Sequence, residues 1–222
     1  MSVYLTINLF IIIFPLLLTF LPEFKFYQKF KPLLFSILLV GGFFLLWDML
    51  ATLRGDWSFN PLYTGGIQVF NLPLEEVLFF VAVPYSCLFL YEGLVKIILE
   101  KQVFYNRYLY FVMAGLAFLA AFIFAAKSYS LIIFMLTGIL FLAGGLWLKK
   151  IFSSLLFWVW LILVMLLFII FNYFLTSLPV VVYNPNAILG LRILTIPIED
   201  FFYNYSLLTL YLAAYLFVRT SR

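Results

Sequence analysis

Two pairs of acidic residues stand out in an otherwise apolar sequence. Glu75 and Glu76 form one pair, Glu199 and Asp200 form the other, and each pair begins two residues after a proline. Proline suits the first turn of a helix, so both pairs are predicted to lie at helix starts. The helix dipole accounts for one acid at such a position. It accounts less well for two adjacent acids that recur at the second helix start. Carboxyl groups within membranes usually face a partner or a cavity, and we therefore interpret these four as functional.

The chemistry open to these pairs is proton transfer. Desolvation in an apolar cavity and a second acid close by both disfavour ionisation, so one member could keep its proton and act as a general acid. Phe79 and Tyr203 lie four residues after Glu75 and Glu199, which places a ring on the same helical stripe as each acid. Such rings could stabilise a carbocation through their negative faces. The chain has 29 Phe and 15 Tyr, so a purely structural role for these two rings stays open.

The acidic pairs belong to a longer internal repeat. Residues 60–80 align without a gap with residues 184–204, at an offset of 124 residues (184 minus 60). Asn60 and Asn184 begin the two segments, and each is followed by a proline. Both asparagines are typical of loop-shaping turns and are also candidates for substrate contact. A gapless match of Asn-Pro, Gly and Pro-x-Glu-acid is rare by chance, which indicates an internal duplication.

A third acidic position precedes the first pair. Asp48 is placed near the outer end of an apolar segment, level with the two glutamates, and Asn172 is its counterpart in the repeat. An acid inside a membrane span is a functional candidate by default, so we include Asp48 among the residues that could contact a substrate. An ion pair with Arg54, or a role at the helix end, is the alternative.

The composition indicates a protein that lies almost entirely in a membrane. Hydrophobic residues make up 67% of the 222 residues, charged residues 10%, and the mean hydropathy is +1.19. A soluble domain has about 25% charged residues. Several apolar runs reach the roughly 20 residues that a helix needs to cross the hydrocarbon layer, and they lack the alternation of barrel strands. We predict an all-α integral membrane protein.

Seven spans are predicted, each with boundaries good to a few residues. They are 2–21, 32–52, 73–94, 108–126, 129–148, 154–177 and 197–218. The N-terminal segment lacks the basic start and cleavage site of a signal peptide, so it is counted as the first span. The repeat divides this single membrane domain of residues 1–222 into a 3+1+3 arrangement. Repeat one covers 1–94, a linker helix covers 108–126, and repeat two covers 129–218.

The basic residues predict the orientation. Seven spans place ten of the 13 basic residues, Arg222 among them, on one side, and only Arg54, Lys127 and Arg192 on the other. The positive-inside rule then puts the N-terminus outside the cell membrane and the C-terminus in the cytoplasm. An even number of spans separates equivalent helices, so the repeats are parallel and equivalent residues lie at equal depth. Both acidic pairs are therefore expected at the outer face.

Several classes of site are missing from the sequence. There is no histidine, and Cys87 is the single cysteine. These counts remove most zinc, haem and iron–sulfur sites and every Ser-His or Cys-His arrangement. Dinucleotide-binding glycine motifs are also missing, so we expect neither a metal nor a cofactor. The positive charge is modest and spread over the loops, which gives no reason to expect nucleic acid as a partner.

The motifs and the layout together resemble a known family. The doubled Pro-x-Glu-(Glu/Asp) motif, the Phe-Asn-Pro at 59–61 and the 3+1+3 layout resemble the membrane-integral lycopene cyclase family, whose two halves occur as separate subunits or fused. The chain looks like the fused form over nearly its whole length. It departs where Tyr183 stands opposite Phe59 and where Asn172 stands opposite Asp48. This asymmetry suggests that one half carries more of the chemistry.

The resemblance implies an activity and roles for the acids. The activity is cyclisation of the linear ends of lycopene to γ- and β-carotene, an isomerase or intramolecular lyase reaction without net redox change, in contact with the lipid bilayer. The implied roles are acid and base for Glu75 and Glu199, tuning or sharing of the proton for Glu76 and Asp200, and lining of the cation for Phe79 and Tyr203.

Two other classes of function fit the sequence. One is a small membrane transporter, because some carriers also use parallel three-helix repeats and a proton-coupled carrier could use these acids. The other is a non-catalytic subunit of a pigment complex, with the acids as helix caps. The sequence leaves open the ring type, the number of ends cyclised and the carotenoid length. Formation of a homo-oligomer and contact with other carotenoid-pathway enzymes are open as well.

Overall fold

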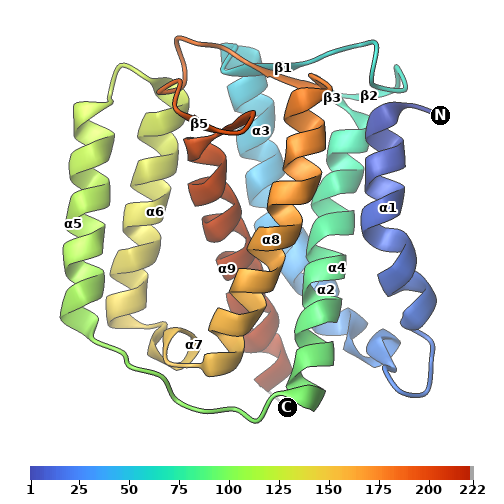
Figure 1. The fold of residues 1–222 in the computed structure, drawn as a ribbon, viewed down its shortest axis with the longest axis vertical. Helices are drawn as coiled ribbons and strands as arrows, with labels where there is room; N and C mark the ends of the chain where they lie inside the picture. The colour runs from blue at the N-terminus through green and yellow to red at the C-terminus, as the bar shows by residue number, and fades with distance from the viewer. Residues whose placement is uncertain (221–222) are drawn as a thin grey trace.

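The structure, a computed structural model, describes residues 1–220, which form a bundle of long helices joined by loops (Figure 1). The helices in chain order are α1 (Val3–Leu18), α2 (Phe30–Ser36), α3 (Gly42–Arg54), α4 (Leu74–Ile97), α5 (Arg107–Ile123), α6 (Ser128–Leu146), α7 (Lys149–Phe152), α8 (Leu155–Ser177) and α9 (Ile198–Thr220). A 3-10 turn, η1 (Phe26–Lys29), precedes α2, and a π-helical turn, η2 (Ile37–Gly41), joins α2 to α3.

Helices are present at each of the seven predicted spans. Within residues 1–220, five helical segments are long and apolar enough to cross a membrane, namely the segment from Phe26 to Arg54, α4, α6, α8 and α9. Two more apolar helices, α1 and α5, are shorter. The N-terminus and the C-terminus lie at opposite ends of the bundle (Figure 1). The chain is a multi-pass helical membrane protein, and seven crossings stay a prediction.

The two long loops, which connect α3 to α4 and α8 to α9, contain short strands. Outside a helix the loop backbone must find other hydrogen-bond partners, and pairing of extended segments provides them. Each loop closes a small antiparallel hairpin, and one strand of each loop pairs with the other loop. The pairs are β2 (Gln68–Val69) with β3 (Leu72–Pro73), β5 (Arg192–Ile193) with β6 (Ile196–Pro197), and β1 (Trp57–Phe59) with β4 (Val181–Tyr183). All lie at the same end as the N-terminus (Figure 1).

Geometry recurs in the two halves at the offset of the sequence repeat. In the β1–β4 pair, Ser58 lies opposite Val182, its own counterpart 124 residues later. The helix α1 packs against α4 as α6 packs against α9. The two hairpins are closed by equivalent bonds, from Leu74 N–H to Ile67 O at 2.9 Å and from Ile198 N–H to Leu191 O at 3.0 Å. This recurrence is consistent with a duplication of the three-helix unit, which we propose as the origin of the two halves.

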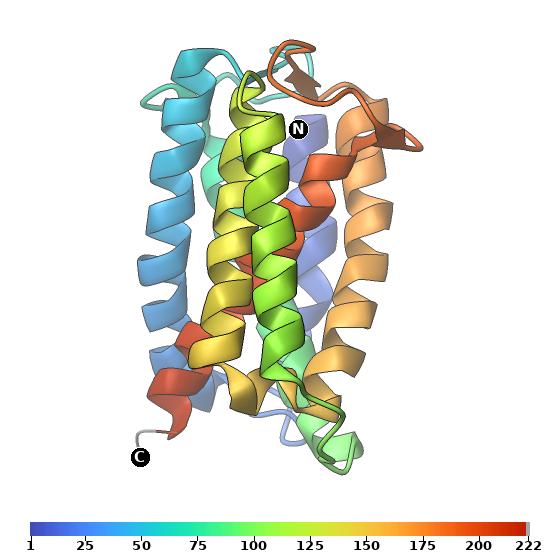
Figure 2. The same ribbon diagram turned by 90° about the vertical axis from the view of Figure 1, so that its left-hand side faces the viewer.

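The last helix lies at the centre of the bundle. Figure 2 shows α9 running obliquely between the other helices, from the loop end to the opposite end. Tyr211 of α9 is fully buried, and its hydroxyl donates to the carbonyl of Phe80 in α4 at 3.1 Å. A Cβ atom at Gly41 would lie 2.6 Å from that hydroxyl, so glycine is needed where the π-turn approaches α9. These contacts fix three helices against one another beneath the loops.

Most described basic side chains lie in or beside the loops at the C-terminal end of the bundle. They are Lys25, Lys29, Lys31, Lys96, Lys101, Arg107, Lys149, Lys150 and Arg219. At this end the buried Glu92 of α4 accepts a hydrogen bond from Tyr215 at 2.7 Å and pairs with Arg219 at 3.0 Å. Arg222, which was predicted here, lies outside the described residues. The opposite end, with the strands, carries the acidic pairs.

Candidate functional site

The acidic pairs occupy the first turns of α4 and α9, as predicted. All four side chains are buried. The loop that precedes each helix folds back as a hairpin, and the proline of each motif is the last residue of that hairpin. Because successive residues of a helix point in different directions, the two members of a pair have different surroundings.

The first member of each pair, Glu75 or Glu199, connects a long loop to two helices through hydrogen bonds. In each case one carboxylate oxygen accepts two hydrogen bonds, one from a serine hydroxyl and one from a backbone N–H of the loop. The donors, all at 2.6 Å, are Ser2 and Gly65 for Glu75, and Ser130 and Leu189 for Glu199. A Cβ atom at Gly65 would lie 2.8 Å from the Glu75 oxygen, so glycine permits this close approach. The surroundings are those of a structural clamp.

The second member in the first half, Glu76, faces the interior of the protein. Its carboxyl group accepts a hydrogen bond from the hydroxyl of Tyr4 in α1. Asp48 of α3 lies near enough to interact with it electrostatically. Asp48 is itself buried, and among the described residues its Oδ2 has no hydrogen-bond partner. The indole N–H of Trp57 is a hydrogen-bond donor to Asp48, so Glu76 and Asp48 form a buried pair of acids with one side-chain donor each.

The second member in the other half, Asp200, has much richer polar contacts. Its Oδ1 accepts a hydrogen bond from the hydroxyl of Tyr129 at 2.8 Å. Its Oδ2 accepts two more, from Asn172 Nδ2 at 2.9 Å and from the hydroxyl of Tyr183 at 2.7 Å. Three donors on one carboxylate stabilise its negative charge.

Glu76, Asp200 and Asp48 line one small pocket of about 80 Å³ beneath the β1–β4 strands. We call it the acid pocket. Aromatic residues make up much of its wall, contributed by Tyr4, Trp57, Phe59, Phe79, Tyr129, Phe168, Tyr183 and Tyr203. Neighbouring rings pack against each other, with centroids 5.0 Å apart for Trp57 and Tyr129. The pocket thus combines several carboxyl groups with an aromatic enclosure.

The structure brings together some of the predicted site residues and separates others. Phe79 and Tyr203 line the acid pocket together with Asp48. Asn60 and Asn184 do not, because each side-chain oxygen accepts a hydrogen bond from the backbone N–H two residues further on, at 3.1 and 2.9 Å. These two shape the turns, and a substrate contact for them stays a prediction. Glu75 and Glu199, expected as the primary acid and base, are likewise separate from the pocket.

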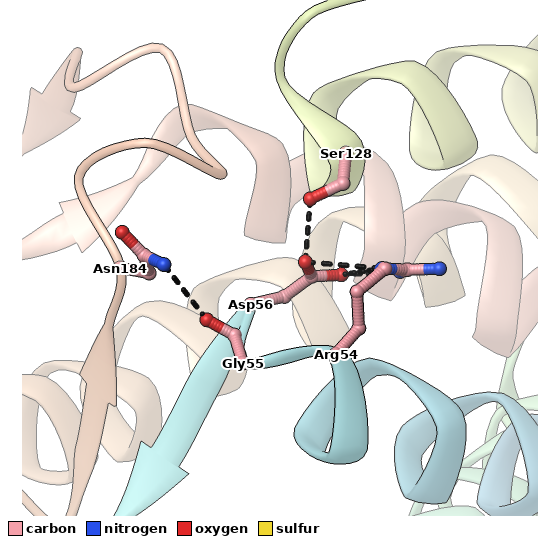
Figure 3. A network of polar contacts seen from close by, with 5 residues as sticks. All are labelled: Arg54, Gly55, Asp56, Ser128 and Asn184. Carbon is pink, nitrogen blue, oxygen red and sulfur yellow. Dashed lines mark hydrogen bonds and ion pairs between the residues drawn. The ribbon is translucent and has the colours of Figure 1, made fainter.

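A network of hydrogen bonds and an ion pair joins the two long loops near the start of α6 (Figure 3). The carboxylate of Asp56 accepts hydrogen bonds from the guanidinium of Arg54 and from the hydroxyl of Ser128, the first residue of α6. The sequence left open an ion pair between Arg54 and Asp48. In the structure Arg54 is paired with Asp56 instead. The side-chain amide of Asn184 donates to the carbonyl of Gly55 at 2.9 Å. The network ties the first long loop to α6 and to the second long loop.

We call Glu76 and Asp200, which line the acid pocket, the inner acids, and Glu75 and Glu199 the outer acids. Sequence reasoning missed the tyrosines that donate hydrogen bonds to the inner acids. Tyr4 and Tyr129 begin equivalent helices, since their N–H groups donate to the equivalent carbonyls of Tyr63 and Ala187 at 3.1 and 3.0 Å. Their offset is 125 rather than 124, so a gapless alignment does not pair them. Tyr183 could have been found from the sequence, because it stands opposite Phe59 in the repeat and differs from it by a hydroxyl group. Burial and then the nearby Asp200 raise the pKa of Tyr183 well above its ordinary value, so it remains a donor at neutral pH.

The part of the chain that the structure describes holds no group of three His, Cys, Asp or Glu side chains that could bind a metal ion. Glu76 and Asp200 of the acid pocket accept hydrogen bonds from hydroxyl and amide donors, whereas Oδ2 of Asp48 has no partner among the described residues. What the arrangement offers chemically is proton donation and acceptance beside aromatic rings.

Fold and pocket together define an integral membrane protein with a pocket of buried carboxyl groups and aromatic rings. Comparison with family models identifies the family: the model for lycopene cyclase matches residues 1–94 and 126–218. The chain belongs to the lycopene cyclase family, and this membership supports a carotenoid-cyclising function. No curated protein and no solved structure matches the chain. The two matched stretches contain both acidic pairs and omit α5.

Proposed function

We propose that the chain is a lycopene β-cyclase that converts the linear ends of lycopene to β-rings, giving γ- and then β-carotene. The observation that carries this proposal is that Glu76 and Asp200, from equivalent positions of the two halves, line one aromatic pocket. Family membership supplies the substrate class. The reaction rearranges bonds within one molecule, so it needs one proton donor, one proton acceptor and stabilisation of a cation between the two steps.

Glu76 is the proposed proton donor. Two buried carboxyl groups close to each other do not readily ionise together, so the Glu76–Asp48 pair retains a proton. Transfer of that proton to the terminal double bond of the linear end group leaves a tertiary carbocation. The next suitably placed double bond attacks this cation and closes a six-membered ring, which carries the positive charge onward.

The aromatic wall and Asp200 complete the proposed reaction. Phe79 and Tyr203 line the pocket and can present their ring faces to the cation. Asp200, whose three donors favour its carboxylate form, is the proposed base that removes a proton from the ring and leaves the β-ring double bond. One proton is added and one removed, so the product is an isomer of the substrate and no redox partner is required. The next turnover requires return of the proton to Glu76.

This assignment differs from the one that the resemblance implied. Glu75 and Glu199 are proposed to be positioning residues that hold the loops over the pocket, because their contacts are with serine hydroxyls and loop N–H groups. The roles of donor and acceptor pass to Glu76 and Asp200. A carboxyl group has to reach the substrate to transfer a proton, and these two line the pocket.

The proposed orientation keeps the acid pocket near the outer face of the membrane. The basic side chains gather at the C-terminal end of the bundle, and the positive-inside rule places that end in the cytoplasm. A reporter fused at either terminus would be accessible from outside only at the N-terminus. Access at the C-terminus alone would reverse the orientation.

The test of the function is expression in a non-pigmented bacterium that accumulates lycopene, with chromatography of the pigments. The chain is expected to form γ- or β-carotene, and the double variant Glu76→Gln, Asp200→Asn is expected to leave lycopene unchanged. Unchanged lycopene with the parent chain, present in the membrane, would reject the cyclase proposal. Equal product from parent and double variant would keep the cyclase and reject the two acids.

A further inference from the structure

An apolar cleft lies against the acid pocket, on the side of α1 and α8. Its volume is about 360 Å³, and side chains of α1, α4, α8 and α9 form its wall. Five residues line both the cleft and the acid pocket, namely Phe79, Phe168, Asn172, Leu175 and Asn204. The cleft and the acid pocket therefore lie on either side of a shared wall.

The cleft extends along much of the bundle and faces the lipid. A neighbouring cavity of about 590 Å³ continues it between Val3 and Phe14 of α1 and between Phe171 and Leu178 of α8. The lining of α1 reaches from Val3 to Leu18, which at about 1.5 Å per residue is roughly 22 Å along the helix. Phe10 and Phe14 at its mouth are 62% and 67% exposed. We call these two cavities the α1–α8 cleft.

The equivalent aromatic residues of the other half are packed together. Phe44 and Trp47 of α3 correspond to Phe168 and Phe171 of α8, and both are buried. Tyr203, the counterpart of Phe79, lies between them with ring centroids 5.3 Å from Phe44 and 5.1 Å from Trp47. Phe168 and Phe171 are only half-buried and line the open cleft. The duplicated scaffold is thus open on one side and filled by aromatic rings on the other.

We propose that the α1–α8 cleft is the route by which one end of a linear carotenoid passes from the bilayer to the acid pocket. This inference rests on the proposed function. An elongated, apolar space with aromatic walls fits an extended polyene. Movement of the side chains in the shared wall, Phe79 and Phe168 among them, would let the terminal double bond reach Glu76. The remainder of the polyene stays in the cleft and in the lipid beside Phe10 and Phe14.

A single route has a consequence for the order of products. While one end lies in the acid pocket, the other end points away along the cleft and is out of reach of the acids. Each binding event therefore closes one ring, and a two-ring product requires release, reversal and rebinding in the membrane. The one-ring carotenoid is a free intermediate and not one held by the enzyme.

Matched substitutions test the route. Leu167 lines the cleft at its mouth, whereas its neighbour Leu166 is exposed to lipid and lies outside the lining. Leu167→Trp narrows the cleft, and Leu166→Trp adds the same side chain to the outer surface. A second pair, Val83→Phe in the cleft and Val81→Phe on the exposed face of α4, repeats the comparison on another helix. Each variant is expressed with lycopene, and ring formation is measured per amount of protein in the membrane.

We expect Leu167→Trp and Val83→Phe to form rings about tenfold more slowly than their partners, an effect of about 1.4 kcal/mol on the barrier. In the parent, a pulse of lycopene should give a one-ring pool that rises before the two-ring product. Lycopene should also co-purify with Glu76→Gln and be lost when Leu167→Trp is added. Equal rates for cleft and surface variants of an active parent, or two-ring product without a one-ring pool, would overturn the inference. An inactive parent would instead reject the proposed function.

Discussion

The two halves of the molecule each supply one inner acid to the same pocket, but they surround it differently. In the first half Glu76 has one hydroxyl donor, Tyr4, and an acidic neighbour, Asp48. In the second half Asp200 has three donors, and Asn172 stands where the first half has Asp48. An acidic neighbour favours retention of a proton, whereas several donors favour the ionised form. This difference is the basis for the proposed roles of Glu76 as proton donor and Asp200 as proton acceptor at equivalent positions of the two halves.

The largest effect is expected from removing either inner acid. Glu76→Gln and Asp200→Asn each keep the size of the side chain but abolish proton transfer at that position. Loss of general acid or base catalysis reduces rates by about 10²- to 10⁴-fold, and we expect each single variant to fall in that range. Chromatography of pigments from lycopene-accumulating cells, with the protein quantified in the membrane, measures it. Activity within a few-fold of the parent in either variant would contradict the assignment.

Exchange of the neighbouring residue should weaken the difference between the halves. Asp48→Asn gives Glu76 the neighbour that Asp200 has, and Asn172→Asp gives Asp200 an acidic neighbour. We expect each to slow ring formation roughly 10- to 100-fold, because the first leaves the donor without a shared proton and the second disfavours the ionised acceptor. Both are measured by initial rates in membranes. If Asn172→Asp were faster than the parent, Asp200 would not be the ionised partner.

The tyrosine that distinguishes the second half gives a smaller effect. Tyr183→Phe removes one of three donors to Asp200 and installs the residue found at the equivalent position, Phe59. A hydrogen bond to a charged group contributes about 1.5–3 kcal/mol, and with two donors remaining we expect a loss of roughly 5- to 10-fold. The converse variant, Phe59→Tyr, adds a hydroxyl near Glu76 and serves as its control, with no gain in rate expected.

The pH dependence separates the role of Tyr183 as a donor from a role as a titrating group. Burial and Asp200 raise its pKa well above the ordinary value, so its hydroxyl keeps the proton through the physiological range and loses it only at strongly alkaline pH. The alkaline limb of the pH–rate profile should therefore have the same midpoint in the parent and in Tyr183→Phe. A shift of that midpoint in the variant would show that Tyr183 titrates during the reaction.

The smallest effect is expected at the outer acids. Glu75→Gln and Glu199→Gln each retain a side-chain oxygen that can accept from the serine hydroxyl and the loop N–H. We expect less than about a threefold change in rate and about 1 kcal/mol loss of stability, as for a single weakened hydrogen bond. Thermal unfolding in detergent and the pigment assay measure the two quantities. Complete loss of product in a well-folded Glu75→Gln protein would return the chemistry to the outer position.

The sequence predicted the fold more fully than the site. Long apolar runs located the helices, and the proline before each acidic pair placed the four acids at first turns, because both signals are local. Which acid of a pair faces the pocket depends on the rotation of α4 and α9 against their neighbours, and this is a property of packing. The same limit applies to Tyr4 and Tyr129, whose helices pack on the acids from elsewhere in the chain. The strands in the loops were not predicted, because they are only two or three residues long and depend on pairing, within each loop for the hairpins and between the loops for β1 and β4.

Infrared spectroscopy of the purified protein near neutral pH tests directly whether Glu76 and Asp200 differ in protonation. Protonated carboxyl groups have a C=O stretching band separate from that of carboxylates, so difference spectra between parent and variant isolate one side chain. We predict that Glu76→Gln, or Asp48→Asn, removes part of the protonated band, whereas Asp200→Asn removes only carboxylate absorption. Loss of protonated absorption in Asp200→Asn, with none in Glu76→Gln, would contradict the account.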